Sequence, residues 1–352
     1  MNDITKPLIT TIIPTYRRPT LLRRAIKSVL NQTYPNFQVC VYDNASGDET
    51  ADVVSEFSKN DPRIKYHCHP KNIGALNNFN YGMQRVNTPF FSFLSDDDLL
   101  LPEFYETALE GFENHPKAIF SSTLTLYGDD HSNIWSSFIF NWTPGFYQPP
   151  DGLLSILKNG HPTWTGILFR REVIEKAGIL NSNIGGASDL DFELRAAAQF
   201  PFVISLKPGA IFVSHPASLC AQAGFSHIWP GWLNMYRKIK ENKQIPLEAR
   251  TYAAHLLTER TKKELYFIWL RSIANKNFKD GIKASDILSN HYHLKTMAFF
   301  LSKITKLCAF FPAICNLSIL LFKIRRFVSI KKLKYLQNGE ISSSISEYIK
   351  TL

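Results

Sequence analysis

Three adjacent carboxylates follow a hydrophobic run in the stretch FFSFLSDDD, residues 90–98. Asp96, Asp97 and Asp98 repel one another, so they need water or a cation beside them. Carboxylate oxygens are the ligands that Mg²⁺ and Mn²⁺ prefer, and a cation held by two of them can in turn hold phosphate groups. The alternative is helix capping, because Ser and Asp are favoured at helix starts and LLLPEFYETALEGF follows. One aspartate can cap a helix while another binds a cation.

A second polar segment, DNASGD, follows the apolar run FQVCVY at residues 37–42. In the simpler interpretation it is a turn before a helix, with Asp48 as the helix cap. In the functional interpretation, Asp43 or Asn44 hydrogen-bonds the edge of a nucleobase, while Tyr16 packs on the face of the same base. The residue types alone are compatible with both interpretations.

Asp189 and Asp191 lie two positions apart in SDLDFELRAAAQF, which has the pattern of an amphipathic helix. Side chains two apart on a regular helix point in different directions, so both cannot face one cavity. In one interpretation, the negative charge of one of them stabilises the N-terminus of the helix. In the other, one of them is a general base beside a loop that Gly185 and Gly186 make flexible. His215 is either an ordinary loop or core residue or a ligand to metal or phosphate.

Short apolar runs alternate with helical stripes in the first half of the chain, which predicts a parallel sheet covered by helices on both faces. The expected strands are residues 8–13, 37–42, 63–67 and 89–94. Open α/β sheets bind ligands outside the carboxyl ends of their strands. We therefore expect the segments after the first, second and fourth strands to converge on one site.

The basic charge of the chain is concentrated in its C-terminal third. The 352 residues carry a formal net charge of +10 and are 45% hydrophobic, which is enough for a full core and excludes a disordered chain. Residues 232–352 hold 22 Lys and Arg against 8 Asp and Glu. We expect one domain at 1–231 and a basic, partly apolar helical region at 232–352 that meets an anionic partner.

The anionic partner expected for this region is a membrane surface. The apolar stretch at 307–322 is shorter than the ~20 residues of a spanning helix and is interrupted by Pro312, while basic residues flank it on both sides. This pattern predicts an interfacial segment. No nucleic-acid-binding motif is recognisable, so a nucleic-acid partner is not expected.

The five cysteines and the N-terminus indicate a cytoplasmic protein. The cysteines are odd in number and form no Cys-x-x-Cys pair, so neither a disulfide framework nor a zinc site is predicted. The first residues, MNDITKPLITTIIP, do not have the pattern of a signal peptide. We expect a peripheral protein on the inner face of the cell membrane.

Six ordered motifs together resemble the inverting, nucleotide-sugar-dependent glycosyltransferases of family 2, which have the GT-A fold. The motifs are TIIPTYRR, VYDNASGDET, KNIGALNNFNYG, FLSDDDLLLP, WTGILFRREVIEKAG and GGASDLDFELR, and the resemblance covers roughly residues 6–220. It implies an α/β GT-A domain that transfers a sugar from a UDP- or dTDP-sugar to a hydroxyl of a saccharide or lipid-linked acceptor, with Mn²⁺ or Mg²⁺ as cofactor. The preferred setting is synthesis of surface polysaccharide or lipopolysaccharide.

The resemblance also assigns roles to residues. Asp189 is the expected catalytic base, and the metal is expected on Asp98 and Asp96, with His215 as a further candidate. The expected donor-binding residues are Pro14, Thr15, Tyr16, Arg17, Asp43, Asn44, Asn72, Gly74, Asn80, Asp96 and Asp97. The residues expected on the acceptor side are Trp164, Gly166 and Asp191.

Three positions depart from the family pattern and leave the donor sugar open. Asn44 stands where many members have a second Asp, Ser188 where Glu is common, and Phe79 where Arg is common. Two rival functions remain: a catalytically degenerate, membrane-bound scaffold of the same fold, and a sugar nucleotidyltransferase. The nucleotidyltransferases are expected to have a glycine-rich loop after the first strand, whereas PTYRRP contains no glycine.

Overall fold

The computed structural model of the chain describes residues 8–129, 134–137, 141–214, 225–311 and 340–352. The chain divides into two compact units. The first comprises residues 1–182, 188–218 and 337–352, and the second comprises residues 183–187 and 219–336. The division expected from the sequence, after residue 231, differs in three places: residues 183–187 and residues 219–231 belong to the second unit, and the last helix belongs to the first.

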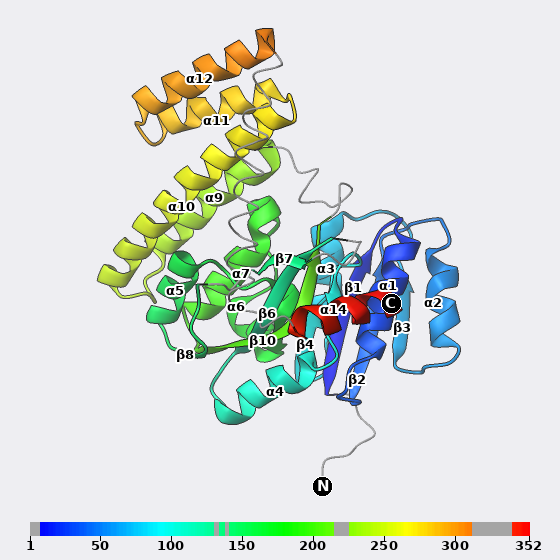
Figure 1. The fold of residues 1–352 in the computed structure, drawn as a ribbon. Coiled ribbons are helices and arrows are strands. Elements are labelled where there is room, and N and C mark those ends of the chain that lie inside the picture. Colours follow the sequence, from blue (N-terminus) through cyan, green and yellow to red (C-terminus); the bar gives the residue numbers. More distant parts are fainter. Residues whose placement is uncertain (1–7, 130–133, 138–140, 215–224, 312–339) are drawn as a thin grey trace. The chain divides into compact units, whose positions relative to one another are not determined.

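A mixed β-sheet runs through the first unit (Figure 1). The strand order is β3-β2-β1-β4-β9-β6-β10-β5, with β7 paired to β6 and β8 paired to β10. The strands are β1 (Ile9–Thr15), β2 (Phe37–Asp43), β3 (Ile64–Cys68), β4 (Phe90–Phe93), β5 (Leu99–Leu100), β6 (Phe120–Gly128), β7 (Ile134–Ser137), β8 (Gly145–Tyr147), β9 (Ile167–Arg170) and β10 (Phe202–Val213). β1 to β4 are parallel, as predicted, whereas β9 runs antiparallel to both of its neighbours, β4 and β6.

Helices pack on both faces of this sheet. The helical segments of the first unit are α1 (Pro19–Leu30), α2 (Thr50–Ser58), α3 (Ala75–Met83), α4 (Phe104–Asn114), α5 (Asp151–Asn159), η1 (Trp164–Gly166), α6 (Glu172–Ala177), α7 (Ser188–Ala197) and α14 (Glu340–Thr351). Alternate residues of a strand point to opposite faces. Ile13 accordingly joins a core cluster with Ile26 of α1, while Ile12 lies so close to α3 that a Cβ on Gly82 would be 2.6 Å from its side chain.

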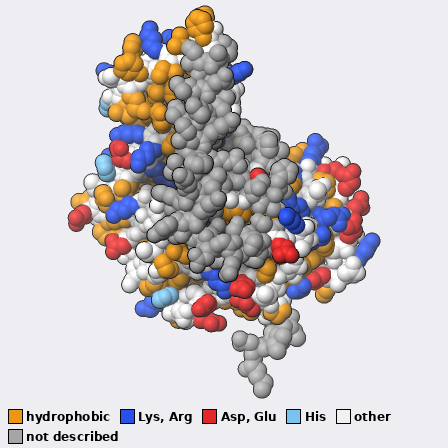
Figure 2. Space-filling model, viewed as in Figure 1, with side chains coloured by type: hydrophobic (Ala, Val, Ile, Leu, Met, Phe, Trp, Pro, Cys, Tyr) orange, Lys and Arg blue, Asp and Glu red, His pale blue; other side chains and the backbone are white. Residues whose placement is uncertain are grey.

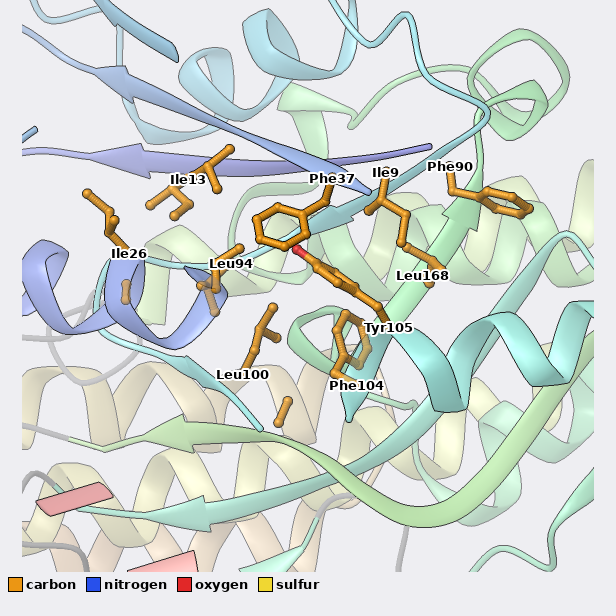
Figure 3. Packing of buried hydrophobic residues seen from close by; sticks show 14 of the residues in the cluster. Ile9, Ile13, Ile26, Phe37, Phe90, Leu94, Leu100, Phe104, Tyr105 and Leu168 are labelled. Carbon is orange, nitrogen blue, oxygen red and sulfur yellow. The ribbon is translucent and has the colours of Figure 1, made fainter. Parts of the chain in front are cut away.

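The core between α1, α4 and the sheet is built largely from aromatic and branched side chains (Figure 3). Tyr105 of α4 is fully buried there, with its ring 5.3 Å from that of Phe37 and 5.4 Å from that of Phe104. Its hydroxyl is hydrogen-bonded to Thr11 of β1, so the polar tip is satisfied within the core. This core fixes α4 against β1 and β2, whose carboxyl ends carry candidate site residues.

The direction of each strand determines which ends share an edge of the sheet. Because β9 is antiparallel to β4, the start of β9 lies at the edge where β4 ends. β10 is parallel to β6 and ends at Val213 on this same edge. The edge therefore gathers the carboxyl ends of β1, β2, β4 and β10 together with η1, which directly precedes β9.

The second unit is helical. Among its described residues, the helices are η2 (Ser182–Ala187, of which residues 183–187 belong to this unit), α9 (Phe225–Glu241), α10 (Leu247–Ala274), α11 (Phe278–Asn290) and α12 (Lys295–Phe310). Leu265, Trp269 and Ile273 of α10 form a hydrophobic core with residues of α11 and α12. In the described part of the chain, no helix has both the length and the apolar character needed to cross a membrane. Of the apolar stretch 307–322, only residues up to 311 are described.

The last helix, α14, packs on the sheet of the first unit. Ile345 and Ile349 are buried with Leu99, Leu101 and Val213, among other residues. The Tyr348 hydroxyl donates to a backbone carbonyl of β5, that of Leu100, at 3.2 Å. The final segment of the chain is therefore part of the structure that supports the acidic triplet, which immediately precedes β5.

Candidate active site

Hydrogen bonds join the carboxyl ends of the three strands that the sequence predicts to converge. The Thr15 hydroxyl donates to Asp96 Oδ2 at 2.8 Å, which links β1 to the segment after β4. The backbone N–H of Asn44 donates to the Thr15 carbonyl at 2.9 Å, and the backbone N–H of Arg17 donates to Ser46 Oγ at 2.8 Å. The three segments thus form one connected group of residues at one edge of the sheet.

The three carboxylates of the acidic triplet have different surroundings. Arg18 Nη1 lies 3.1 Å from Asp96 Oδ1 and 3.0 Å from Asp97 Oδ2. Asp98 is turned into the protein, where its Oδ1 accepts from the Val213 N–H at 2.9 Å and its Oδ2 accepts from the Thr165 hydroxyl at 2.8 Å. Asp97 is therefore the member of the triplet that keeps the most exposure to solvent.

Burial raises the pKa of two of these aspartates. The pKa of Asp96 is raised to about 6, first by loss of hydration and then by the charge of Asp97, with Arg18 opposing the shift. The pKa of Asp98 is raised well above its ordinary value by the same two causes, although the bonds from Val213 and Thr165 oppose it. The triplet is thus a region in which negative charge is costly and a cation is favoured.

Helix capping by the triplet, the alternative weighed from the sequence, is not what the structure shows. β5 follows the triplet, and α4 begins only at Phe104 with Glu103 at its N-cap position. Asp48, by contrast, does support the start of a helix, because its Oδ1 accepts from the Thr50 N–H of α2 at 3.0 Å. The packing of the two leucines of β5 against the core separates the triplet from α4.

The substitution Asp98→Asn is expected to stabilise the fold at neutral and alkaline pH. An Asn side chain can still accept from the Val213 N–H and can donate to Thr165 Oγ1, while the buried charge disappears. Because the folded-state pKa of Asp98 is raised, the wild type keeps its full stability below the unfolded pKa of about 4 and loses stability as the pH rises through the folded pKa.

The stability gain of Asp98→Asn should therefore be small near pH 4 and clearly larger at pH 8. Thermal unfolding of both proteins in chelator-containing buffer across this range measures the difference. A gain that is equal at both pH values, or a lower Tm for the variant at pH 8, would contradict the account of Asp98.

Asp43, at the end of β2, is fixed as a hydrogen-bond acceptor by two residues that the sequence reasoning missed. Its Oδ1 accepts from the N–H and hydroxyl of Ser46, at 2.9 and 2.6 Å. Its Oδ2 accepts from the Tyr66 hydroxyl of β3 at 2.7 Å, and burial, followed by this bond, raises the pKa of Tyr66. Ser46 could have been found as a residue close after Asp43 in a turn, where Asp side chains often bond the nearby backbone, whereas Tyr66 follows only from the pairing of β2 with β3.

Asn44, Asn72 and Gly74 shape the loop before α3. Asn44 Nδ2 donates to Asn72 Oδ1 at 3.0 Å, and its Oδ1 accepts from the Ile73 N–H at 2.8 Å. Gly74 has a φ of 86° at the N-cap of α3, a conformation that favours glycine. The side chain of Asn44, predicted to bind the donor, is thus engaged in holding this loop.

The other residues predicted to bind the sugar-nucleotide donor are either near the surface at this edge of the sheet or buried in structural contacts. Tyr16 is exposed, and the Arg17 guanidinium lies 5.1 Å from the centre of its ring. Pro14 is buried within β1. Asn80 is also buried, and both atoms of its side-chain amide bond the backbone of Leu180 at 2.9 Å. Asn80 therefore connects α3 to the segment that leads towards α7, rather than facing a ligand.

The three residues predicted on the acceptor side have different environments. Trp164 is half-buried, with its ring 4.7 Å from Phe79 and 4.9 Å from Phe93. Gly166 is buried against Thr125, and a Cβ there would lie 2.3 Å from the Thr125 hydroxyl. These contacts leave Trp164 as a candidate for the acceptor side and explain Gly166 by close packing.

Asp191, the third of these residues, has a structural partner. It is only 3% exposed, and its Oδ2 accepts from Arg195 Nε at 2.8 Å. Arg195 also donates to the carbonyls of Ala177 and Ile179, the latter at 2.9 Å. A buried carboxylate held in this way helps to fix the start of α7, and the acceptor-side role of Asp191 stays a prediction.

Asp189 lies in the first turn of α7 and is half-buried, with its Oδ1 accepting from the Leu190 N–H at 2.7 Å. Phe192 of the same helix packs on Phe169 of β9 with ring centres 5.4 Å apart. Since β9 is the neighbour of β4, α7 packs on a strand adjacent to the one that precedes the triplet. Gly185, shortly before α7, has a φ of 66°. His215 lies outside the described residues.

A divalent cation fits the triplet when a diphosphate supplies further ligands. In the described part of the chain, no group of three or more His, Cys, Asp or Glu side chains is arranged to hold a metal by itself. Mg²⁺ sites that use substrate phosphates need only one or two protein carboxylates. Asp96 and Asp97, which share Arg18, provide such a pair.

Residues 10–178 match the family model described as "Glycosyl transferase family 2". This part of the chain belongs to glycosyl transferase family 2. The family 2 region contains the acidic triplet, Asp43 and Trp164, and it ends before Asp189. The family predicted from the six motifs is thereby confirmed.

Curated relatives of the chain include other glycosyltransferases. The GalNAc(5)-diNAcBac-PP-undecaprenol beta-1,3-glucosyltransferase of Campylobacter jejuni is 37% identical over 105 residues, which are 30% of this chain and 34% of that protein. An uncharacterized glycosyltransferase of Rickettsia felis is 36% identical over 262 residues, which are 70% of this chain and 41% of that protein. The chain thus spans less than half the length of these two relatives.

Solved structures with a similar fold include residues 1–349 of S. aureus TarS in complex with UDP-GlcNAc, with a TM-score of 0.64 and 16% identity over 80% of each chain. The same TarS fragment without the sugar nucleotide has a TM-score of 0.62 and 15% identity, over 85% of this chain and 90% of that one. The fold is therefore GT-A with an appended helical region, as the sequence predicted.

Proposed function

We propose that the chain is a metal-dependent, inverting glycosyltransferase that transfers a sugar from a UDP- or dTDP-sugar to a hydroxyl group of a saccharide or lipid-linked acceptor. The observation that carries this proposal is the hydrogen-bonded linkage of Asn44, Thr15 and Asp96 at one edge of the sheet, where Asp43 pairs with Thr15 in register, within a family 2 region. The family relation makes sugar transfer the expected reaction, and the linked residues supply the groups for binding a sugar nucleotide.

Asp43 is proposed to select the base of the donor. Ser46 and Tyr66 already donate to its carboxylate, which keeps it an acceptor that favours a base with an N–H at its edge. Uracil and thymine have such a donor at N3, whereas N3 of cytosine is an acceptor. The exposed ring of Tyr16 is proposed to stack on the base.

Asp97 and Asp96 would hold the divalent cation, while the buried hydrogen bonds of Asp98 would fix the segment that carries them. This moves the role predicted for Asp98 to Asp97, because Asp98 is turned into the protein towards Val213 and Thr165, whereas Asp97 is the most exposed of the three. When bound, Mn²⁺ or Mg²⁺ supplies positive charge to the diphosphate leaving group. Arg18, which contacts both carboxylates, is placed to hold their side chains in orientation.

Asp189 is proposed as the general base. It would take the proton of the acceptor hydroxyl while that oxygen attacks the anomeric carbon from the face opposite the nucleotide. The bond between the anomeric carbon and the phosphate oxygen breaks as the new bond forms, so the configuration inverts. The contacts of Asn80 with Leu180 and of Arg195 with Ile179 hold the segment that approaches α7 and would help to keep Asp189 in place.

The acceptor is proposed to be carried on a lipid, with the protein peripheral on the cytoplasmic face of the membrane. Two observations support this setting. The name of the Campylobacter relative contains an acceptor linked to PP-undecaprenol, and residues 232–352 carry a large excess of basic side chains. Assembly of a surface polysaccharide or lipopolysaccharide is the corresponding pathway class.

Nucleotide binding gives a direct test. With Mn²⁺ present, UDP and dTDP are expected to stabilise the protein by about 2.7 kcal/mol at about 100 times their Kd, whereas CDP at the same concentration should stabilise it less. Thermal unfolding and calorimetric titration measure both effects. A stabilisation by CDP as large as that by UDP would contradict the role of Asp43.

Release of nucleoside diphosphate from a panel of UDP- and dTDP-sugars then tests catalysis. Slow release from at least one donor is expected, since water can replace the acceptor hydroxyl. Binding of UDP without release from any donor in the panel, even with lipid-linked and saccharide acceptors added, would favour the degenerate scaffold. Formation of a sugar nucleotide from sugar phosphate and UTP would instead indicate a nucleotidyltransferase.

A further inference from the structure

Helix α12 is anchored to the second unit by one side only. Ala298, Leu301, Thr305 and Cys308 are buried, and they recur at the three- and four-residue spacing of a single helical face. The Thr305 hydroxyl accepts a hydrogen bond from Trp269 Nε1 of α10 at 2.8 Å. The position of the helix is thus fixed by packing, whereas most side chains on its remaining sides are exposed in the part of the chain that the structure describes.

The remaining sides of α12 and the residue that follows it are strongly hydrophobic. Of the twelve large hydrophobic side chains that are exposed among the described residues, seven lie between positions 297 and 311, with exposed fractions from 37% to 83%. The seven, named here the α12 face, are Met297, Phe299, Phe300, Ile304, Leu307, Phe310 and Phe311. Figure 2 shows hydrophobic side chains gathered over the region that α11 and α12 occupy in Figure 1. Such a concentration marks an interaction surface.

The charges on α12 are all positive. Lys295, Lys303 and Lys306 are exposed, and the helix contains no Asp or Glu. Lys303 Nζ lies 5.4 Å from the centre of the Phe299 ring, so a lysine borders the hydrophobic surface directly. Lysine side chains in this position can extend along apolar groups and present their ammonium to phosphates.

We propose that the α12 face docks on an anionic lipid bilayer, with the helix lying along the surface, its aromatic and aliphatic side chains among the upper acyl chains and its lysines at the lipid phosphates. The 16 residues of α12 and its three lysines do not suit a spanning helix. A second copy of the chain is a poorer occupant, because it would bring further lysines and no acidic group from this helix. Docking on the bilayer is argued from the α12 face alone; only its connection with a lipid-linked acceptor rests on the proposed function.

Flotation of the full chain with lipid vesicles tests the inference. The wild type is expected to float with vesicles of equal parts phosphatidylcholine and phosphatidylglycerol, and much less with pure phosphatidylcholine. Phe300→Glu/Leu307→Glu should lower the partition coefficient at least about tenfold. Lys303→Gln/Lys306→Gln should lower it about thirtyfold on the anionic vesicles and little on neutral ones.

The matched control is Leu247→Glu, since Leu247 is 69% exposed on α10 of the same unit. This variant is expected to float as the wild type does, and all variants should keep the wild-type Tm. Flotation of Phe300→Glu/Leu307→Glu equal to that of the wild type would overturn the inference. So would a wild type that does not float but forms a dimer which this double substitution dissociates.

Release of UDP from the donor in vesicle-free buffer separates this inference from the proposed function. The α12 variants are expected to match the wild type in that assay, because the substitutions lie outside the first unit. Failure of the wild type to release UDP would contradict the proposed function, while the flotation result would still decide the role of the α12 face.

Discussion

Asp189→Asn is expected to lower the rate of sugar transfer by about 10²–10⁴-fold while leaving the affinity for UDP within about twofold of the wild type. An amide cannot take the proton from the acceptor hydroxyl, so the chemical step slows, but Asp189 makes no proposed contact with the nucleotide. The Leu190 N–H that donates to Asp189 Oδ1 can donate equally to the Asn oxygen, which preserves the start of α7. Steady-state rates at saturating donor and calorimetric titration with UDP provide the two measurements.

Asp191→Asn is the matched control for Asp189→Asn, because it removes a carboxylate from the same turn of α7. Asp191 is buried and binds Arg195, so its loss is expected to lower the free energy of unfolding by up to about 3–5 kcal/mol and the Tm with it. The rate per folded molecule should fall far less than in Asp189→Asn. If the two variants lose activity equally while both remain folded, the base has been assigned to the wrong residue.

The sequence predicts the part of this fold that depends on local patterns. Apolar, β-branched runs such as ITTIIPT and FQVCVY identify buried strands, and parallel order then brings their carboxyl ends together. The Thr15–Asp96 hydrogen bond connects residues 81 positions apart, yet its two segments were predicted to meet. The antiparallel direction of β9 was not predicted, because alternation of side chains carries no information on direction.

The assignments that the sequence could not make depend on long-range contacts. Asp98 is turned inward by Val213 and Thr165, which are 115 and 67 positions away, so three identical neighbours in the sequence have different surroundings in the structure. Likewise, the spacing of Ile345, Tyr348 and Ile349 suits an amphipathic helix, but only the packed cluster shows that α14 lies against β5 and β10. A basic C-terminal region was therefore predicted as one piece, although its last helix supports the catalytic sheet.

The different surroundings of Asp97 and Asp98 lead to opposite expected outcomes for two similar substitutions. Asp97→Asn removes a charge that remains close to solvent and shares Arg18 with Asp96. Loss of a metal-binding carboxylate is expected to weaken Mn²⁺-dependent UDP binding at least about 100-fold, since even residues that merely support metal ligands contribute about 10–100-fold. The Tm in chelator-containing buffer should change little, because Asp97 is the least buried of the three aspartates.

Asp98→Asn, in contrast, should leave UDP binding in the presence of Mn²⁺ within about tenfold of the wild type and raise the Tm in chelator-containing buffer at pH 8. Both of its hydrogen bonds can be kept by the amide, so the loop that carries Asp96 and Asp97 retains its support. Calorimetric titration of UDP with and without Mn²⁺ on both variants distinguishes the two aspartates. If Asp98→Asn loses the Mn²⁺ effect and Asp97→Asn keeps it, the cation is held by the inward-facing carboxylate after all, and its bonds to Val213 and Thr165 must break when the donor binds.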